Sequence, residues 1–80
     1  MMPIDKSAFY QKIDDLLELP SGSVKGSTAL ADTEEWDSLA VITFIAMVDG
    51  EYSISLPANE IANCGTIDDL AALVEKNQPA

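Results

Sequence analysis

Residues 34–42 read EEWDSLAVI, and this stretch marks the point where an irregular segment gives way to a helix. Before it the chain is acidic and rich in turn formers, and after it apolar residues recur at helical spacing with no breaker until Gly50. Asp37 and Ser38 therefore stand at the helix start, where either side-chain oxygen can accept amide hydrogens of the first turn. The helix dipole also favours a phosphate ester at the Ser38 hydroxyl. Taken alone, however, the Asp-Ser pair favours the structural explanation, a helix cap.

The composition describes a small, acidic, folded chain. Its 80 residues suffice for one hydrophobic core, and an apolar content of 48% argues against wholesale disorder. We therefore expect a single domain spanning residues 1–80. Fourteen acidic residues against four lysines give a formal net charge of −10. Nucleic acid and anionic membranes are excluded as expected partners, because both require a basic surface. A basic protein surface would instead be attracted over some distance.

The absence of histidine excludes several classes of activity. No Ser-His-Asp or Cys-His arrangement can be built, and Cys64, the only cysteine, can form neither a zinc site nor an internal disulfide. We therefore expect no metal site and no catalysis by this chain alone. The first residues lack the apolar run of a signal peptide, and no stretch is long enough to span a bilayer. These features predict a cytoplasmic protein.

Apolar spacing predicts three longer helices and one short helix. Asp5 is a plausible cap for the first, Pro57 suits the start of the short one, and residues 66–69 (TIDD) resemble a capping box. Between the first two helices lies a long loop, residues 20–36, from which we expect at least Leu30 to dock into the core. The class predicted is all-α, a small four-helix bundle. Its helices should span residues 5–18, 38–51, 58–62 and 66–76, the last stopped by residues 77–79.

The second predicted helix is apolar on two sides, which leaves two interpretations open. An all-round apolar helix is either buried on most sides or uses one side for binding. The stripe that looks like core consists of Val41, Phe44, Ile45, Val48 and Tyr52. The other side carries Leu39, Ile42 and Ala46, with Thr43 and Asp49 beside them.

Three features together resemble the acyl carrier protein family, the phosphopantetheine-binding carrier domains. They are Asp37-Ser38-Leu39 at the second helix, the spacing through residues 52–57 (YSISLP), and residues 66–70 (TIDDL) at the last helix. Leu30 and Asp32 in the first loop also fit. Asp-Ser-Leu alone is a weak motif, but the resemblance spans roughly residues 4–76 and includes the helix order.

This resemblance implies a function and a set of site residues. Ser38 would receive a phosphopantetheine arm from coenzyme A through a separate phosphopantetheinyl transferase, and the arm would carry an acyl or aminoacyl group as a thioester. Asp37 would help present Ser38 and contact the transferase's magnesium, and Asp37 and Leu39 would form the cofactor-binding site together with Ser38. The implied partner-facing side of the second helix consists of Leu39, Ile42, Thr43, Ala46 and Asp49. Loading enzymes and downstream synthases or transferases would be further partners of a monomeric carrier.

One departure from the family bears on the pathway. Carriers of fatty acid synthesis typically have a strongly acidic second helix, whereas the corresponding positions here include Thr43 and Gly50, leaving Asp49 and Glu51. This favours an acyl carrier of a specialised biosynthetic pathway. The alternatives are an aminoacyl or peptidyl carrier and a helical adaptor that carries no arm.

Overall fold

The computed structural model describes residues 4–78, which form four α-helices around one hydrophobic core. A one-turn 3-10 helix, η1 (Leu30–Asp32), lies in the long loop before the second α-helix. The prediction of an all-α four-helix bundle with a long first loop is confirmed. The helices are α1 (Lys6–Leu16), α2 (Ser38–Tyr52), α3 (Ala58–Ala62) and α4 (Ile67–Lys76).

The helix ends lie close to the predicted positions. Asp5 caps α1, as expected, by accepting a hydrogen bond from the Ala8 amide. The first helix ends two residues earlier than predicted, because Glu18 adopts a left-handed backbone with φ of 58°. Asn77 follows α4 as its C-terminal cap, and Pro79, part of the predicted stop, lies outside the described residues.

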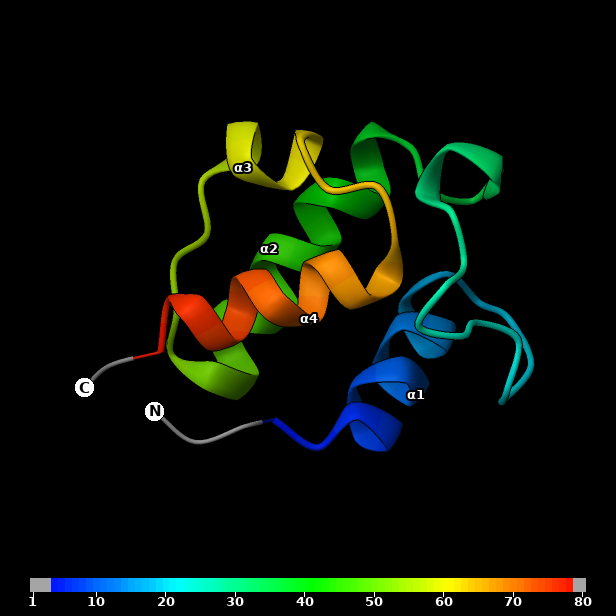
Figure 1. The fold of residues 1–80 in the computed structure, drawn as a ribbon, viewed down its shortest axis with the longest axis horizontal. Helices are drawn as coiled ribbons and strands as arrows, with labels where there is room; N and C mark the ends of the chain where they lie inside the picture. Colours follow the sequence, from blue (N-terminus) through cyan, green and yellow to red (C-terminus); the bar gives the residue numbers. More distant parts are fainter. Residues whose placement is uncertain (1–3, 79–80) are drawn as a thin grey trace.

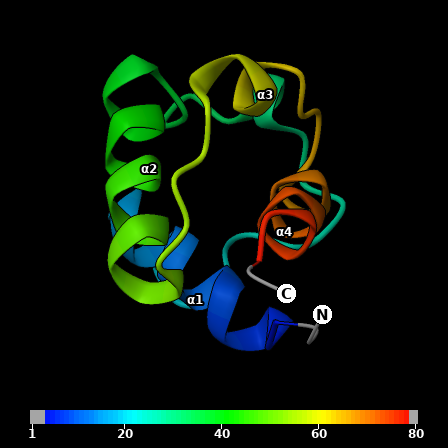
Figure 2. The ribbon, with the colours of Figure 1, turned by 90° about the vertical axis from the view of Figure 1, so that its left-hand side faces the viewer.

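The four helices enclose the core from different sides. Figure 2 shows α2 and α4 on opposite sides, with α3 above and α1 below. Helices α1 and α3 each contact both α2 and α4, so the shorter helices join the two sides. Both described ends of the chain lie together in Figure 1, at the pole opposite the start of α2. The largest fully buried apolar side chains are Phe9, Ile13, Phe44, Val48, Ile61, Ile67, Leu70 and Val74.

The predicted core stripe of α2 is correct only at its centre. Phe44 and Val48 are fully buried, whereas Val41, Ile45 and Tyr52 pack against the core but stay partly exposed. Since α2 is covered mainly by α1 and α3, residues at the edges of the stripe keep part of their surface in water. Ala40 was not predicted to be buried. The buried face of α2 consists of Ala40, Phe44 and Val48.

One end of the long first loop is held by a buried carboxylate. Asp14 is only 1% exposed, which is unusual for a charged side chain. Its two carboxylate oxygens accept hydrogen bonds from the amides of Gly22 (2.9 Å) and Val24 (3.0 Å). Because these backbone donors belong to the loop, Asp14 fixes the path of the chain as it leaves α1.

Replacing Asp14 with alanine is expected to destabilise the fold by about 1–3 kcal/mol, because two loop amides lose their partner. The free energy of unfolding, measured in urea by circular dichroism, checks this result. Asp15→Ala is the matched control, since Asp15 is exposed and should change stability by less than about 0.5 kcal/mol. Equal effects of the two substitutions would contradict the anchoring role of Asp14.

The middle of the loop pairs with the segment before α4. Ala29 and Thr66 form an isolated antiparallel bridge, and the Leu30 amide donates to the Gly65 carbonyl at 2.9 Å. Leu30 is 5% exposed, which confirms that it docks into the core. The loop is therefore tied near its start and in its middle, and η1 follows directly on the second tie.

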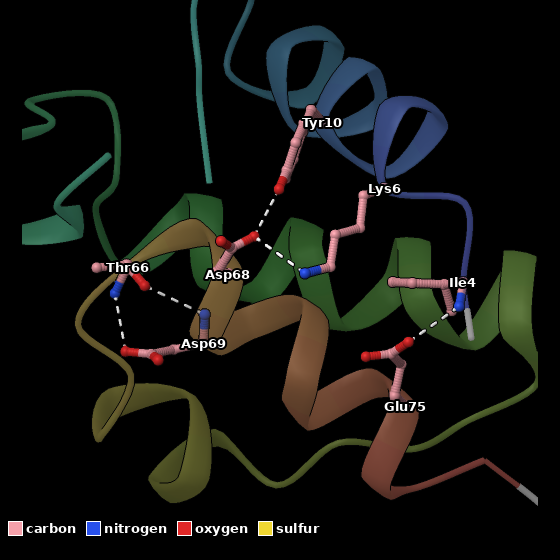
Figure 3. A network of polar contacts seen from close by, with 7 residues as sticks. All are labelled: Ile4, Lys6, Tyr10, Thr66, Asp68, Asp69 and Glu75. Atoms are coloured by element: carbon pink, nitrogen blue, oxygen red, sulfur yellow. Dashed lines mark hydrogen bonds and ion pairs between the residues drawn. The ribbon is translucent and has the colours of Figure 1, made fainter. Parts of the chain in front are cut away.

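The start of α4 carries the predicted capping box and a polar network (Figure 3). Thr66 Oγ1 accepts from the Asp69 amide, and the Asp69 carboxylate accepts from the Thr66 amide at 3.1 Å. Nearby, Asp68 accepts a hydrogen bond from the Tyr10 hydroxyl and forms an ion pair with Lys6, both on α1. These contacts join the N-terminal helix to α4.

Hydrogen bonds from the Gly65 and Thr66 amides hold the pKa of Asp69 below its ordinary value of 3.8. A lowered folded-state pKa stabilises the fold above the unfolded-state pKa and is lost as the pH falls through the folded value. The wild type should therefore be more stable than Asp69→Asn near neutral pH, and this difference should shrink between about pH 5 and about pH 2. Unfolding in urea across this range checks the prediction. A difference that grew as the pH fell would contradict it.

Gly50 lies inside α2 on the exposed surface, and a Cβ atom placed there would meet nothing within 4 Å. Gly50→Ala is therefore expected to stabilise the protein by about 0.5–1 kcal/mol, because glycine loses more backbone entropy in a helix. A rise in the midpoint of urea unfolding would show this effect. A lowered midpoint would mean that the backbone at Gly50 needs glycine.

Candidate functional site

Ser38 is the first residue of α2, and Asp37 before it caps the helix. The Asp37 backbone is extended, and its Oδ1 accepts a hydrogen bond from the Ala40 amide at 2.9 Å. The sequence left open which of the two residues is the cap, and the geometry assigns this role to Asp37. No hydrogen bond within the described part of the chain engages the Ser38 side chain, which is exposed. The hydroxyl is therefore available at the positive end of a 15-residue helix.

Two grooves flank this end of α2. The first, with a volume of about 250 Å³, lies between the end of α1 and the start of α2. The second, of about 310 Å³, lies between η1, α2 and α3 and has no charged side chain in its lining. The first groove is lined by Leu16, Leu17, Glu18, Glu35, Asp37, Leu39, Ala40 and Thr43. The second is lined by Leu30, Ala31, Thr33, Trp36, Val41, Ala58, Ile61, Ala62 and Cys64.

The first groove brings together residues that the sequence did not connect. Glu18 follows α1 and Glu35 precedes α2, yet both line the groove beside Asp37. Their separation along the chain gave no signal of this proximity, which arises from the tertiary fold.

The side of α2 next to Ser38 is open to solvent. Leu39 is 70% exposed and Ile42 is 64% exposed, and they are the large apolar side chains that stand out on the surface of residues 4–78. Thr43, Ala46 and Asp49, predicted on the same side, are exposed as well. Of the two interpretations of this apolar helix, burial on most sides is therefore wrong.

Cys64 packs against the core and lies in the lining of the second groove. Its partial burial, together with the charges of Asp69 and Glu60, raises the pKa of the thiol. The thiol thus stays protonated at neutral pH and is a weak nucleophile.

Neither a candidate metal site nor a membrane-spanning helix occurs among the described residues. Residues 4–78 contain no group of three or more His, Cys, Asp or Glu side chains placed to hold a metal ion. No helix in the described part of the chain has the length and apolar character needed to cross a membrane.

Comparisons with known proteins agree with this geometry. The family model for the phosphopantetheine attachment site matches residues 7–74. An acyl carrier protein from Kineococcus radiotolerans is 24% identical over 72 residues, covering 90% of this chain and 89% of the relative. An acyl carrier protein from Beutenbergia cavernae is 27% identical over 56 residues, covering 70% and 68% respectively.

A solved structure shows the same fold. The solution NMR structure of the holo acyl carrier protein from Geobacter metallireducens is similar with a TM-score of 0.73 and 26% identity, covering 88% of this chain and 80% of that one. The family's cofactor is phosphopantetheine, bound covalently. Since the family model matches most of the chain and the fold agrees, the chain belongs to the acyl carrier protein family.

Proposed function

We propose that Ser38 carries the phosphopantetheine arm and that the chain transports acyl intermediates on it as thioesters. The observation that carries the proposal is the division of roles at the start of α2. Asp37 makes the capping hydrogen bond, so the exposed Ser38 hydroxyl has no structural task within the described residues. The helix dipole stabilises the negative charge of a phosphodiester at this position.

The arm has to be installed by another enzyme. A phosphopantetheinyl transferase would activate the Ser38 hydroxyl and transfer the arm from coenzyme A, because this chain has no histidine to serve as a base. Asp37 would help to present Ser38 and contact the transferase's magnesium. The chain is then a substrate of its partner enzymes and not itself an enzyme.

An acyl cargo is supported by the second groove. The groove has a volume of about 310 Å³, and its lining contains no charged side chain. Trp36 and Val41 are among its lining residues, so the groove lies near the same end of α2 as Ser38. Such a lining suits an alkyl chain better than the ammonium group of an aminoacyl cargo, because desolvating an unpaired charge is costly. An acyl carrier is therefore favoured over an aminoacyl or peptidyl carrier.

The exposed side of α2 is proposed as the partner-facing surface. Loading enzymes and downstream synthases or transferases must reach the arm at Ser38, and the apolar residues next to it are uncovered. The surface comprises Leu39, Ile42, Thr43, Ala46 and Asp49.

A specialised biosynthetic pathway is the proposed setting, with the carrier acting as a cytoplasmic monomer. No charged residue occurs in α2 before Asp49, unlike the acidic second helix typical of fatty acid synthesis carriers. The loaded protein should therefore be a poor substrate for the malonyl-transferring enzyme of fatty acid synthesis. Rates equal to those of an acidic-helix carrier would argue for the general pathway.

Incubation with coenzyme A and a broad-specificity phosphopantetheinyl transferase tests the carrier function. Intact mass spectrometry should show the wild-type chain gaining the mass of one phosphopantetheine group. A helical adaptor would gain nothing, so an unchanged mass with every transferase tried would contradict the proposal.

A further inference from the structure

Ser38 stands on the rim of the first groove. The residues directly before and after it, Asp37 and Leu39, both line this groove of about 250 Å³ between the end of α1 and the start of α2. Ser38 itself is exposed, and its side chain makes no hydrogen bond within the described residues. A group attached to the Ser38 hydroxyl would therefore start beside the first groove.

The lining of the first groove combines free acceptors with apolar walls. Glu18 and Glu35 are exposed, and within residues 4–78 neither carboxylate accepts a hydrogen bond or joins an ion pair. Leucine side chains, among them Leu16 and Leu39, supply the apolar part of the lining. The groove thus suits a ligand that has hydrogen-bond donors on an apolar chain.

Phosphopantetheine has this chemistry. Beyond its phosphate it is a slender, uncharged chain with two amide N–H groups, one hydroxyl and a pair of methyl groups on one carbon. Hydrogen bonds from amide N–H groups to ionised carboxylates are roughly twice as strong as those between neutral partners. The phosphate would stay at the Ser38 oxygen, where the helix dipole offsets repulsion from the carboxylates.

We propose that the first groove is the resting site of the unloaded phosphopantetheine arm. The amide N–H groups of the arm donate to Glu18 and Glu35, and its methyl groups pack on Leu16 and Leu39. The inference rests on the proposed attachment at Ser38 and assigns a position to the arm before cargo is loaded. The tether raises the effective concentration of the arm at the groove, which favours the arm over an occupant from outside the chain.

The second groove is the poorer site for the unloaded arm. Its lining contains no charged side chain, so the arm amides would lose water there without gaining an ionised acceptor. The first groove, at about 250 Å³, is slightly smaller than the roughly 300–1,000 Å³ of usual small-molecule sites, so it suits a slender chain without a long acyl group. The second groove is then left for the alkyl part of a cargo.

The test uses NMR spectroscopy on the chain after arm transfer, with an isotope-labelled protein and an unlabelled arm. Nuclear Overhauser effects should connect the methyl groups of the arm to the side chains of Leu16 and Leu39. Deuterium exchange of the two arm amides should be about fivefold slower than in free phosphopantetheine, as expected if the arm occupies the groove for about four-fifths of the time.

The double variant Glu18→Ala/Glu35→Ala removes the proposed acceptors. Its arm amides should exchange within about twofold of the free rate, and the Overhauser effect to Leu16 should disappear. Glu18 has a left-handed backbone at the end of α1, so Glu35→Ala alone, in the loop, is the second variant if the double variant does not fold. It should lose about half of the slowing, because one of two acceptors remains.

The matched control removes the same charge from nearby positions in the sequence. Asp15 and Glu34 are exposed, and neither lines the first groove. In Asp15→Ala/Glu34→Ala the arm amides should therefore exchange within about twofold of the wild-type rate. An equal loss of protection in this control would leave only net charge as the cause and overturn the resting site.

The remaining outcomes also decide the proposal. Overhauser effects from the arm to Trp36 or Ile61 in place of Leu16 would put the arm in the second groove. Free exchange rates without any such effects would mean that the arm projects into solvent, and either result overturns the resting site. If the wild type accepts no arm at all, the attachment at Ser38 fails as well, whereas an arm at Ser38 without groove contacts removes only this inference.

Discussion

Alanine in place of Phe44 is expected to cost about 3–5 kcal/mol of folding stability, as is usual when a fully buried aromatic ring is removed. Phe44 is 0% exposed and packs edge-on against Phe9 of α1 at a centroid distance of 6.0 Å and against Trp36 of the first loop at 5.8 Å. Its loss would leave a cavity where three segments of the chain meet. Since small domains have only about 5–15 kcal/mol of stability, a large share would disappear.

Urea unfolding followed by circular dichroism measures this loss, and the fluorescence of Trp36, the only tryptophan, reports on the same contact. Ile42→Ala is the matched control, because Ile42 is also a large apolar residue of α2 but is 64% exposed. It should change stability by less than about 0.5 kcal/mol. Comparable losses at both positions would show that α2 faces the core with a different side.

Ser38→Ala is expected to abolish arm transfer completely while leaving the fold intact. The hydroxyl oxygen is the atom that would form the phosphodiester, and alanine has no atom that can replace it. The fold should survive because the capping hydrogen bond to the Ala40 amide comes from Asp37, and alanine is the best helix former. Intact mass spectrometry after incubation with coenzyme A and a transferase measures the loss.

Ser55→Ala serves as the control for this substitution, since Ser55 is another exposed serine, in the segment between α2 and α3. It should accept the arm like the wild type. If Ser38→Ala retained loading, another residue would carry the arm. If it unfolded, Ser38 would be structural, and the separation of capping from attachment would be wrong.

Much of the fold was predictable because its signals are local. The helical spacing of apolar residues and the TIDD capping box placed each helix to within about two residues of its observed ends. The burial of Asp14 was not predictable, because its partners Gly22 and Val24 are loop amides whose position depends on the tertiary fold. The bridge between Ala29 and Thr66 was missed for the same reason, since a pairing of single residues has no pattern in the sequence.

The candidate site was predictable in position but not in detail. The sequence placed Ser38 at a helix start, yet Asp37 and Ser38 are both good caps, and only the geometry separates their roles. An apolar helix does not reveal which side faces water, so the exposure of Leu39 and Ile42 required the structure.

The most direct test of the central claim locates the arm on the chain. A protease that cleaves after glutamate should release residues 36–51 from the loaded protein, and Ser38 is the only serine in this peptide. We expect mass spectrometry to find the phosphopantetheine group on this peptide and, on fragmentation, at Ser38. An arm found on a peptide that contains Ser27, Ser53 or Ser55 would contradict the account.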